Sequence, residues 1–453
     1  MIKSVLIANR GEIAIRIART ARRMGIKTYV VRTAKEPEAV YLSAADAVIN
    51  FPETDGNIPE FLDIDRLVGL AREYKIDSLH PGYGYLSENA ELAERCRDNG
   101  IVFIGPSPEV IRLMGDKVAA KGIAAQSGVP MLGASQGAVH TLDEARKIAK
   151  RLGYPVIIKA VSGGGGRGMR IVHHQDELEQ LYKIATAEAQ VAFNDPSVFI
   201  EKYLENPKHI EFQIVADNYG NVVHLGEREC SIQRKHQKLM EEAPSPALDE
   251  RLRKKMAAAA VSLAKQAGYQ SLGTVEFLLD HQKHFYFMEM NTRIQVEHPV
   301  TEWVTGVDLV QTQLLVAQGK PLPFTQKDIE VRGHAIECRI NAEDPFTFVP
   351  SPGRVTAWHL PGGPGIRIDT HVFSGYTVPP YYDSMIGKII AHGDTREQAI
   401  ARMRVALSEL AVEGIKTNTK LHRELLADER FFQGGTSIHY LEEKLRSRAE
   451  AHK

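Results

Sequence analysis

The sequence contains little cysteine, carries almost no net charge and has no long apolar run. Its 3 cysteines, Cys96, Cys230 and Cys338, are far apart and form no CxxC pair, so we expect neither a disulfide framework nor a zinc site. Lys and Arg number 56 against 57 Asp and Glu, which lacks the basic excess typical of nucleic-acid-binding proteins. No apolar run approaches the ~18 residues needed to cross a bilayer, and the opening MIKSVLIANRGE is too polar for a signal peptide. We therefore expect a cytoplasmic protein that binds no nucleic acid and no membrane.

The composition is that of a globular protein. Hydrophobic residues make up 43% of the chain and charged residues 25%, which excludes disordered, collagen-like and coiled-coil classes. At about 100 to 200 residues per domain, 453 residues allow two to four domains with well-filled cores. We divide the chain into regions 1–115, 116–330 and 331–446.

The first region alternates short apolar runs with amphipathic stretches, the rhythm of a parallel sheet with helical connections. The first turn reads Asn9-Arg10-Gly11-Glu12 and not GxGxxG, so we reject a dinucleotide-binding site. The helix expected at 12–24 is rich in arginine, which we interpret as a solvated surface because the protein is neutral. The strands expected here are 5–8, 28–31, 47–49 and 101–104. The third region is expected to contain a strand at 335–340 and a helix at 396–410.

A glycine-rich loop follows a strand in the second region. The apolar run 156–158 ends in Lys159, and Gly163, Gly164, Gly165 and Gly166 follow closely. Accessible backbone N–H groups beside an ammonium group suit phosphates, although the pattern is not GxxxxGK[ST] and a flexible hinge is the alternative.

Two apolar runs at 274–279 and 285–291 predict a hairpin. With a four-residue loop at 281–284, Glu276 lies directly opposite Glu289, and Asn291 falls on the same face. Like charges this close need neutralisation, and an all-oxygen ligand set suits Mg²⁺ or Mn²⁺. Solvated acids on an exposed sheet face are the alternative, which the upstream phosphate loop makes the weaker one.

Beyond the hairpin, Arg293, Gln295 and Glu297 point the same way if the chain is extended, which predicts an anion clamp beside a base. A structural Arg–Glu pair fits the spacing equally well. In the segment 230–238, a two-residue period places His236 and Lys238 on one strand face, either near phosphate or in solvent. Glu337 and Arg339 alternate with apolar residues, consistent with an active-site arginine or a buried ion pair.

Six longer motifs occur in order along the chain: ANRGEIA near the start, HPGYGYLSEN at 80–89, the loop GGGGRGM, CSIQRKHQKLMEEAP at 230–244, EMNTRIQVEHPVTE at 289–302 and YDSMIGK ending at Lys388. Taken together, these motifs resemble the biotin carboxylase family of the ATP-grasp superfamily. The resemblance covers nearly the whole chain. It implies an ATP-grasp fold of α/β and α+β type, with a Rossmann-like N-terminal domain, a glycine-loop lid at about 131–204 in the ATP-grasp domain, and a C-terminal α+β domain.

The resemblance also implies Mg-ATP-dependent activation of bicarbonate as carboxyphosphate, followed by carboxylation of biotin. The residues it places around ATP are Lys117, Lys159, the lid glycines Gly163 to Gly166, Glu201, Lys202, Leu204, His209, Gln233 and His236. Glu276, Glu289 and Asn291 are the implied Mg²⁺ (or Mn²⁺) ligands.

The remaining implied roles concern the acceptor side of the reaction. Lys238 stabilises the phosphorylated intermediate, Glu297 is the base, and Arg339 stabilises the biotin anion. Arg293, Gln295 and the Val296 backbone seat bicarbonate, and Tyr83 and Gly84 lie near biotin.

No AMKM-like biotin attachment sequence occurs in the chain, so we expect a separate biotin carboxyl carrier protein and a separate carboxyltransferase. The sequence does not distinguish between the possible acyl acceptors. These are acetyl-CoA, the acceptor in fatty acid biosynthesis, propionyl-CoA, pyruvate and other 2-oxo acids. The family suggests a homodimer. The alternatives are another ATP-grasp ligase that passes an acyl phosphate to an amine, a non-catalytic nucleotide-binding regulator and, least of all, a nucleic-acid-binding module.

Overall fold

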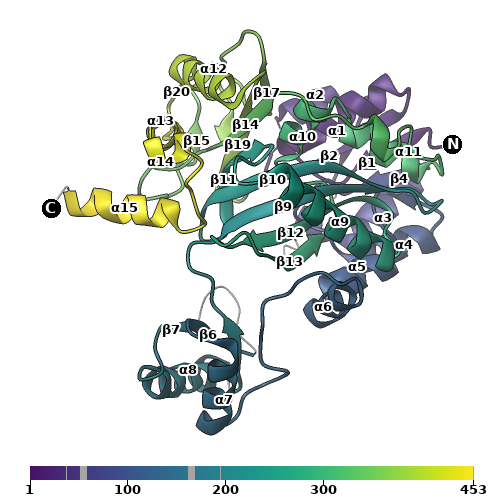
Figure 1. The fold of residues 1–453 in the computed structure, drawn as a ribbon. Coiled ribbons are helices and arrows are strands. Elements are labelled where there is room, and N and C mark those ends of the chain that lie inside the picture. The colour runs from purple at the N-terminus through teal and green to yellow at the C-terminus, as the bar shows by residue number, and fades with distance from the viewer. Residues whose placement is uncertain (37, 52–58, 162–168, 194, 452–453) are drawn as a thin grey trace. The chain divides into compact units, whose positions relative to one another are not determined.

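A computed structural model describes residues 1–36, 38–51, 59–161, 169–193 and 195–451 (Figure 1). The chain divides into two compact units. The first unit contains Met1–Val129, Lys208–Leu278 and Met288–Lys453, and the second contains Pro130–Pro207 and Leu279–Phe287. Among the described residues, no helix is both long and apolar enough to cross a membrane.

The first unit opens with a five-stranded sheet of order β3-β2-β1-β4-β5, in which every pairing is parallel. This confirms the parallel sheet expected from the alternating pattern. Its strands are β1 (Ser4–Ile7), β2 (Lys27–Arg32), β3 (Ala47–Asn50), β4 (Ser78–His80) and β5 (Val102–Phe103).

Helices cover both faces of this sheet because successive strand side chains point to opposite sides. Val5 and Ile7 pack with α1 (Gly11–Arg23) and α11 (Leu309–Ala317), whereas Leu6 packs on the other side with α3 (Ile64–Glu73) and α4 (Ala90–Asp98). Smaller elements complete this part of the unit: α2 (Val40–Ala44), η1 (Glu60–Leu62), α5 (Pro108–Gly115) and α6 (Lys117–Gln126).

The arginine-rich helix α1 is only partly a surface. Arg19, Arg22 and Arg23 are exposed, as expected, but Arg16 is 6% exposed. Its guanidinium group lies 2.6 Å from Glu302 and 2.8 Å from Asp308. The expectation of a wholly solvated face was therefore wrong at Arg16, because acids from distant parts of the chain compensate its charge.

An eight-stranded sheet of order β13-β12-β9-β10-β11-β14-β19-β17 forms the centre of the chain. Helix α12 (Arg396–Glu409) packs on β14 and β19, as Figure 1 shows, and α9 (Glu250–Gln266) packs on β9 and β10. Helix α10 (His298–Thr305) contacts β10, β11, β14 and β19. The strands are β9 (Lys208–Ala216), β10 (Val222–Arg234), β11 (Gln237–Ala243), β12 (Ser271–Leu279), β13 (Phe285–Asn291), β14 (His334–Asn341), β17 (Ile366–Thr370) and β19 (Met385–Gly393).

The strand expected at 335–340 and the helix expected at 396–410 are thus confirmed as β14 and α12. The rest of the first unit consists of η2 (Gln326–Asp328), the short strands β15 (Gly353–Arg354), β16 (Ala357–His359), β18 (Thr377–Val378) and β20 (Ala411–Glu413), and the helices α13 (Thr419–Leu426), α14 (Glu429–Phe432) and α15 (Tyr440–Ala451).

The described residues of the second unit form a three-stranded antiparallel sheet of order β7-β6-β8 and two helices. Val156, Ile158, Val198 and Ile200 from the strands form its core with small residues of both helices. The elements are α7 (Leu142–Leu152), β6 (Val156–Ala160), β7 (Met169–Val172), α8 (Leu178–Phe193) and β8 (Val198–Lys202).

Candidate active site

Polar side chains gather on the central strands of the eight-stranded sheet. On β9, His209 and Glu211 are buried and alternate with Ile210 and Phe212, which belong to the apolar core. The two-residue period of a strand therefore directs the polar pair to one face. This face carries most of the charged residues that the sequence singles out.

Lys238 lies at the centre of this face, surrounded by carboxylates. Its Nζ is 2.5 Å from Glu211, 3.1 Å from Glu276 and 2.6 Å from Glu297. A second cation, Arg228, is fully buried and lies 2.5 Å from the other oxygen of Glu211. The buried acids around Lys238 are thus matched by positive charge, which is the condition for keeping them ionised.

Arg339 on β14 lies beside the same cluster. Its Nη2 is 2.5 Å from Glu241 and 2.9 Å from Glu297, so Glu297 accepts from Arg339 through one oxygen and from Lys238 through the other. Burial works against the charge of Glu297, but Lys238 and Arg339 outweigh it and hold the pKa of Glu297 well below its usual value. For Glu241, burial prevails and raises the pKa to about 7.

The segment after β13 is a turn and not the extended chain that the sequence analysis assumed. Strand β13 ends at Asn291, and α10 begins at His298 with Glu297 at its N-cap. The structure nevertheless brings the predicted residues together. Arg293 Nη1 donates to Gln295 Oε1 at 2.8 Å, and Gln295 Nε2 donates to Glu276 at 3.1 Å.

The loop of the β12–β13 hairpin is one residue shorter than predicted. The Asp280 N–H donates to the His284 carbonyl at 2.9 Å, and the Lys283 N–H donates to the Asp280 carbonyl at 3.1 Å. Lys283 has φ = 66°. These bonds define a three-residue loop, 281–283, in place of the four-residue loop 281–284.

The shorter loop would turn Glu289 away from Glu276, because a one-residue slip moves side chains to the opposite face. However, Asn291 Nδ2 donates to Glu276 Oε1 at 2.8 Å, and Met288 and Glu289 are exposed in succession. A one-residue shift at these two positions accounts for both observations. Asn291 therefore lies beside Glu276, as predicted, and the departure from the prediction is the loop, which is one residue shorter.

Glu276 and Glu289 differ in their electrostatic surroundings. Burial opposes the charge of Glu276, but Lys238 and His209, whose Nε2 lies 2.9 Å away, hold its pKa below the usual range. For Glu289, whose side chain is exposed but whose carboxyl group is partly shielded from water by its surroundings, that desolvation and the negative charge of Glu276 raise the pKa. A cation between these carboxylates would relieve that repulsion. His209, Glu211 and Glu276 also have ligand atoms within 4.8 Å of one another.

The segment 230–238 is a hairpin and not one strand. Gln233 pairs with Lys238, and Arg234 pairs with Gln237. Lys235 and His236 form the turn between them, with φ of 47° and 66°. The prediction that His236 and Lys238 share a strand face was therefore wrong, because the turn interrupts the two-residue period. Gln233 is buried and His236 is exposed.

The remaining predicted residues of the first unit lie in loops and at a helix end. Lys117 is the first residue of α6, where Asp116 caps the helix by accepting from the N–H groups of Val118 and Ala119. The Tyr83 hydroxyl donates to Glu12. Gly84 has φ = 68°, a conformation that glycine adopts without strain.

In the second unit, Lys159 lies on β6 and Glu201 on β8, and their charged groups are 2.5 Å apart. The ammonium of Lys202 donates to the carbonyls of Gly153 and Tyr154 at 3.0 and 2.9 Å. Leu204 follows β8 and is half-buried. The predicted loop residues Gly163, Gly164, Gly165 and Gly166 lie outside the described residues.

The sequence analysis missed several members of the charged cluster. Glu211 was recognisable because it alternates with apolar residues two positions after His209. Glu241 carried no comparable signal, because the sequence around it, Leu-Met-Glu-Glu-Ala at 239–243, does not alternate between polar and apolar residues. Glu88, which accepts from Arg293 Nε at 2.9 Å, comes from a loop far away in the sequence.

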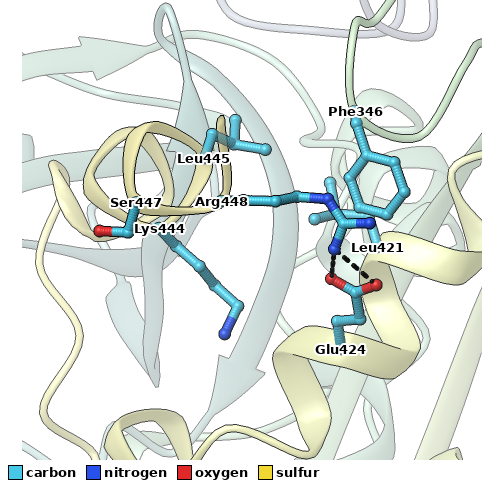
Figure 2. Close-up of a pocket in the computed structure, with 7 residues that line it drawn as sticks. All are labelled: Phe346, Leu421, Glu424, Lys444, Leu445, Ser447 and Arg448. Carbon is cyan, nitrogen blue, oxygen red and sulfur yellow. Dashed lines mark hydrogen bonds and ion pairs between the residues drawn. The ribbon is translucent and has the colours of Figure 1, made fainter. Parts of the chain in front are cut away.

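A separate cavity of about 310 Å³ lies beside α15 and α13 (Figure 2). Its wall includes the ion pair of Glu424 and Arg448 and the ring of Phe346. The described residues that line it include none of those predicted to act on ATP, bicarbonate or biotin.

Three family models match the chain in succession. The biotin carboxylase N-terminal domain matches residues 1–111, the ATP-binding domain of the carbamoyl-phosphate synthase L chain matches 116–325, and the biotin carboxylase C-terminal domain matches 337–443. A biotin carboxylase of Haemophilus influenzae is 53% identical over 98% of this chain and 99% of its own. The chain belongs to the biotin carboxylase family.

Other members of the biotin carboxylase family serve different complete enzymes. The chain is 50% identical to a pyruvate carboxylase component of Methanothermobacter thermautotrophicus, over 98% of this chain and 90% of that one. It also resembles the biotin carboxylase domain of the Hydrogenobacter thermophilus 2-oxoglutarate carboxylase, a dimer solved with MgADP, ADP and bicarbonate. That match has a TM-score of 0.88 and 47% identity over 98% of each chain.

Membership in this family fixes the fold and the type of reaction. The fold is the ATP-grasp fold of biotin carboxylases, with a parallel-sheet N-terminal part, as the motifs implied. The chain is an ATP-dependent ligase that carboxylates biotin, the first half-reaction of the biotin-dependent carboxylases.

Proposed function

We propose that Glu297 is the base that deprotonates bicarbonate, and that carboxyphosphate formed from ATP then carboxylates biotin on a separate carrier protein. The observation that supports this role most is the position of Glu297 between Lys238 and Arg339, at 2.6 and 2.9 Å. These cations keep the carboxylate ionised, so it can accept a hydrogen bond from bicarbonate, and the lowered pKa at the same time makes it a weaker base than a free carboxylate.

Bicarbonate is seated by Arg293, Gln295 and the Val296 backbone. The guanidinium group of Arg293 is oriented by Glu88 through Nε and by Gln295 through Nη1. An oriented guanidinium fork matches the planar oxyanion, and Glu297 follows in the same turn. Proton acceptor and anion clamp thus come from one short segment.

Lys238 stabilises the charge that develops during phosphoryl transfer. In the structure its ammonium engages Glu211, Glu276 and Glu297, and it therefore lies beside a proposed metal ligand and the proposed base. Positioning and charge neutralisation are the main contributions a protein makes to this chemistry.

ATP is bound by the remaining predicted residues. We propose that the second unit is the lid, with Gly163 to Gly166 closing over the phosphates to exclude water from carboxyphosphate. The proposed ATP-binding set is Lys117, Lys159, Glu201, Lys202, Leu204, His209, Gln233, His236, Glu276 and Glu289.

The oxygen-rich donor set fits a magnesium ion. Glu276 and Glu289 supply carboxylates, and the pKa of Glu289, raised by partial desolvation and by Glu276, supports a site where a positive charge is favourable. We propose that these two acids and Asn291 hold Mg²⁺, and Mn²⁺ takes the same ligands. When bound, the metal neutralises phosphate charge.

Arg339 stabilises the anion of the biotin ureido group, which forms when the phosphate released from carboxyphosphate accepts the ureido N–H proton, and Tyr83 and Gly84 lie near the biotin site. The guanidinium group of Arg339 lies 2.9 Å from the proposed base, so the cation and the proton acceptor are adjacent. Such a charge acts strongly because the surrounding groups are buried.

We propose a homodimer with the domains 1–115, 116–330 and 331–446, located in the cytoplasm, which works with a biotin carboxyl carrier protein and a carboxyltransferase. Acetyl-CoA carboxylase is the proposed complete enzyme, and a 2-oxo-acid carboxylase is the second candidate. The second candidate is supported by the similarity to the pyruvate and 2-oxoglutarate enzymes.

The experiment that tests this proposal measures ADP release with Mg-ATP and bicarbonate, with and without free biotin, and traps ¹⁴C-bicarbonate on biotin. We expect biotin to stimulate ADP release and to acquire label. ADP release that ignores biotin, with no label trapped even on a biotinylated carrier, would contradict the proposal and favour an amine acceptor.

A further inference from the structure

Lys388 is a fully buried lysine of β19 that has no role in the proposed reaction so far. Strand pairing places it directly opposite Arg339 on β14 and opposite Asp369 on β17, so all three side chains share one sheet face. Its relative exposure is 0%. A charge at such a position is costly unless it is paired and hydrogen-bonded.

The ammonium of Lys388 contacts two groups from different parts of the first unit. Nζ donates to the backbone carbonyl of Val296 at 2.7 Å and lies 3.0 Å from Glu12 Oε1. The same oxygen of Glu12 accepts from the Tyr83 hydroxyl. One cation therefore connects the turn that carries the proposed base with the tyrosine proposed to lie near biotin.

The hydrogen bond to Val296 constrains the position of Glu297. A peptide unit is planar, so fixing the Val296 carbonyl also fixes the direction of the Glu297 N–H at the start of α10. On the preceding peptide, the Gln295 carbonyl accepts from His298 Nδ1 at 2.8 Å, which fixes the Val296 N–H. Both peptide planes of the turn are thus held by buried side chains.

A neighbouring acid does not compete for Lys388. Glu337, which is also fully buried, has no hydrogen-bond partner for either carboxyl oxygen among the described residues. Burial raises its pKa well above the usual value, which favours the neutral form of this carboxyl group. Glu12, at 3.0 Å, is the carboxylate that pairs with Lys388 among the described residues.

We infer that Lys388 is a positioning residue that holds the Val296–Glu297 turn in the geometry needed for bicarbonate, and that Glu12 couples this turn to Tyr83. The inference rests on the proposed roles of Val296, Glu297 and Tyr83. The alternative is a purely structural lysine that balances the charge of Glu12.

The test compares Lys388→Met with the double variant Glu12→Gln/Lys388→Met, in which Glu12 is not left as an unpaired carboxylate. Lys416→Met is the matched control, because Lys416 is exposed and pairs with Asp344 at the surface. The KM values for bicarbonate and ATP are measured from ADP release, with and without biotin, and folding is followed by thermal unfolding.

In the folded double variant we expect the bicarbonate KM to rise about tenfold or more while the ATP KM stays within about twofold, because a loosened turn affects only the anion. Unchanged values, or parallel changes in both KM values, would overturn the positioning role. If the wild type releases ADP with bicarbonate but never labels biotin, biotin is not the acceptor and the proposed function is wrong. The bicarbonate KM of the variants still tests the role of Lys388 in that case.

Tyr83→Phe provides a test that does not depend on the folding of the Lys388 variants, since it removes only one hydroxyl. Coupling through Glu12 predicts an increase of about threefold in the bicarbonate KM at unchanged ATP KM. A bicarbonate KM equal to that of the wild type would refute the coupling.

Discussion

Glu297 and Arg339 lie 2.9 Å apart, with Lys238 on the opposite oxygen of the same carboxylate. This places the proposed proton acceptor between the cation assigned to phosphoryl transfer and the cation assigned to biotin. Phosphoryl transfer and the carboxylation of biotin therefore share one carboxylate, that of Glu297. The variants below separate the two steps.

Glu297→Gln should abolish biotin carboxylation, by about 10³-fold or more, because an amide cannot accept the proton of bicarbonate. ATP binding should persist, since Lys238 keeps Glu211 and Glu276 as partners. Label trapped on biotin and the Kd for ATP are the two measurements. Glu330→Gln, at an exposed acid, is the control. Weak ATP binding with intact turnover would rule out Glu297 as the base.

Arg339→Ala should reduce biotin turnover by about 10²-fold because one preorganised charge is lost. The affinity for ATP should change far less. The comparison requires kcat with biotin and the Kd for ATP on the same preparation. Equal losses in both would argue against an arginine that faces biotin.

Glu289→Gln should raise the Mg²⁺ concentration needed for half-maximal ADP release, because one charged ligand becomes neutral. EDTA should stop the wild-type reaction, and added Mg²⁺ should restore it. Glu250→Gln, at an exposed acid of α9, serves as the control. An unaltered Mg²⁺ requirement would remove Glu289 from the ligand set.

Glu241 should make the protein less stable as the pH rises from about 5 to 7. Its pKa in the folded protein, raised by burial to about 7, exceeds the value in the unfolded chain. Its contribution is therefore fully present below the unfolded pKa and is lost as the pH approaches the folded pKa. Tm measured across this range should show a shallower decline for Glu241→Gln than for the wild type, and identical slopes would contradict the shift.

Arg16→Met should destabilise the first unit by about 3 kcal/mol or more, because Glu302 and Asp308 lose their buried partner. Urea unfolding gives the free energy. Arg19→Met on the exposed side of the same helix should change it by less than about 0.5 kcal/mol. Similar values for the two variants would show that Arg16 is not a buried partner.

Local patterns predicted the elements better than the connections between them. The parallel sheet and strand β14 followed from periodicity, because alternation records which side chains are buried. The turn at Lys235–His236 was missed because neither residue is a typical turn former, although both adopt positive φ. The three-residue hairpin loop and the compensating shift at Met288–Glu289 likewise depend on sheet geometry that a single strand pattern does not encode.

The members of the charged cluster that lie in long sequence motifs were predicted. Those that are recognisable only by their contacts with distant residues were missed. Lys238, Arg293 and Arg339 were given roles from the segments that contain them, whereas neither Arg16 nor Lys388, although Lys388 ends the motif YDSMIGK, was given one. Their partners, Glu302 and Glu12, are hundreds of positions away. Burial and pairing of this kind are visible only once the chain is folded.

The pair of Glu12 and Lys388 has a consequence for how the chain is synthesised. Glu12 is translated long before the lysine that neutralises it, because Lys388 lies in β19. The N-terminal sheet can form its hydrophobic contacts during translation, but its first helix keeps a carboxylate that must stay hydrated until β19 is made. Completion of the first unit thus waits until β19 is translated, and a nascent chain that lacks β19 exposes the surface around α1 to chaperones and proteases.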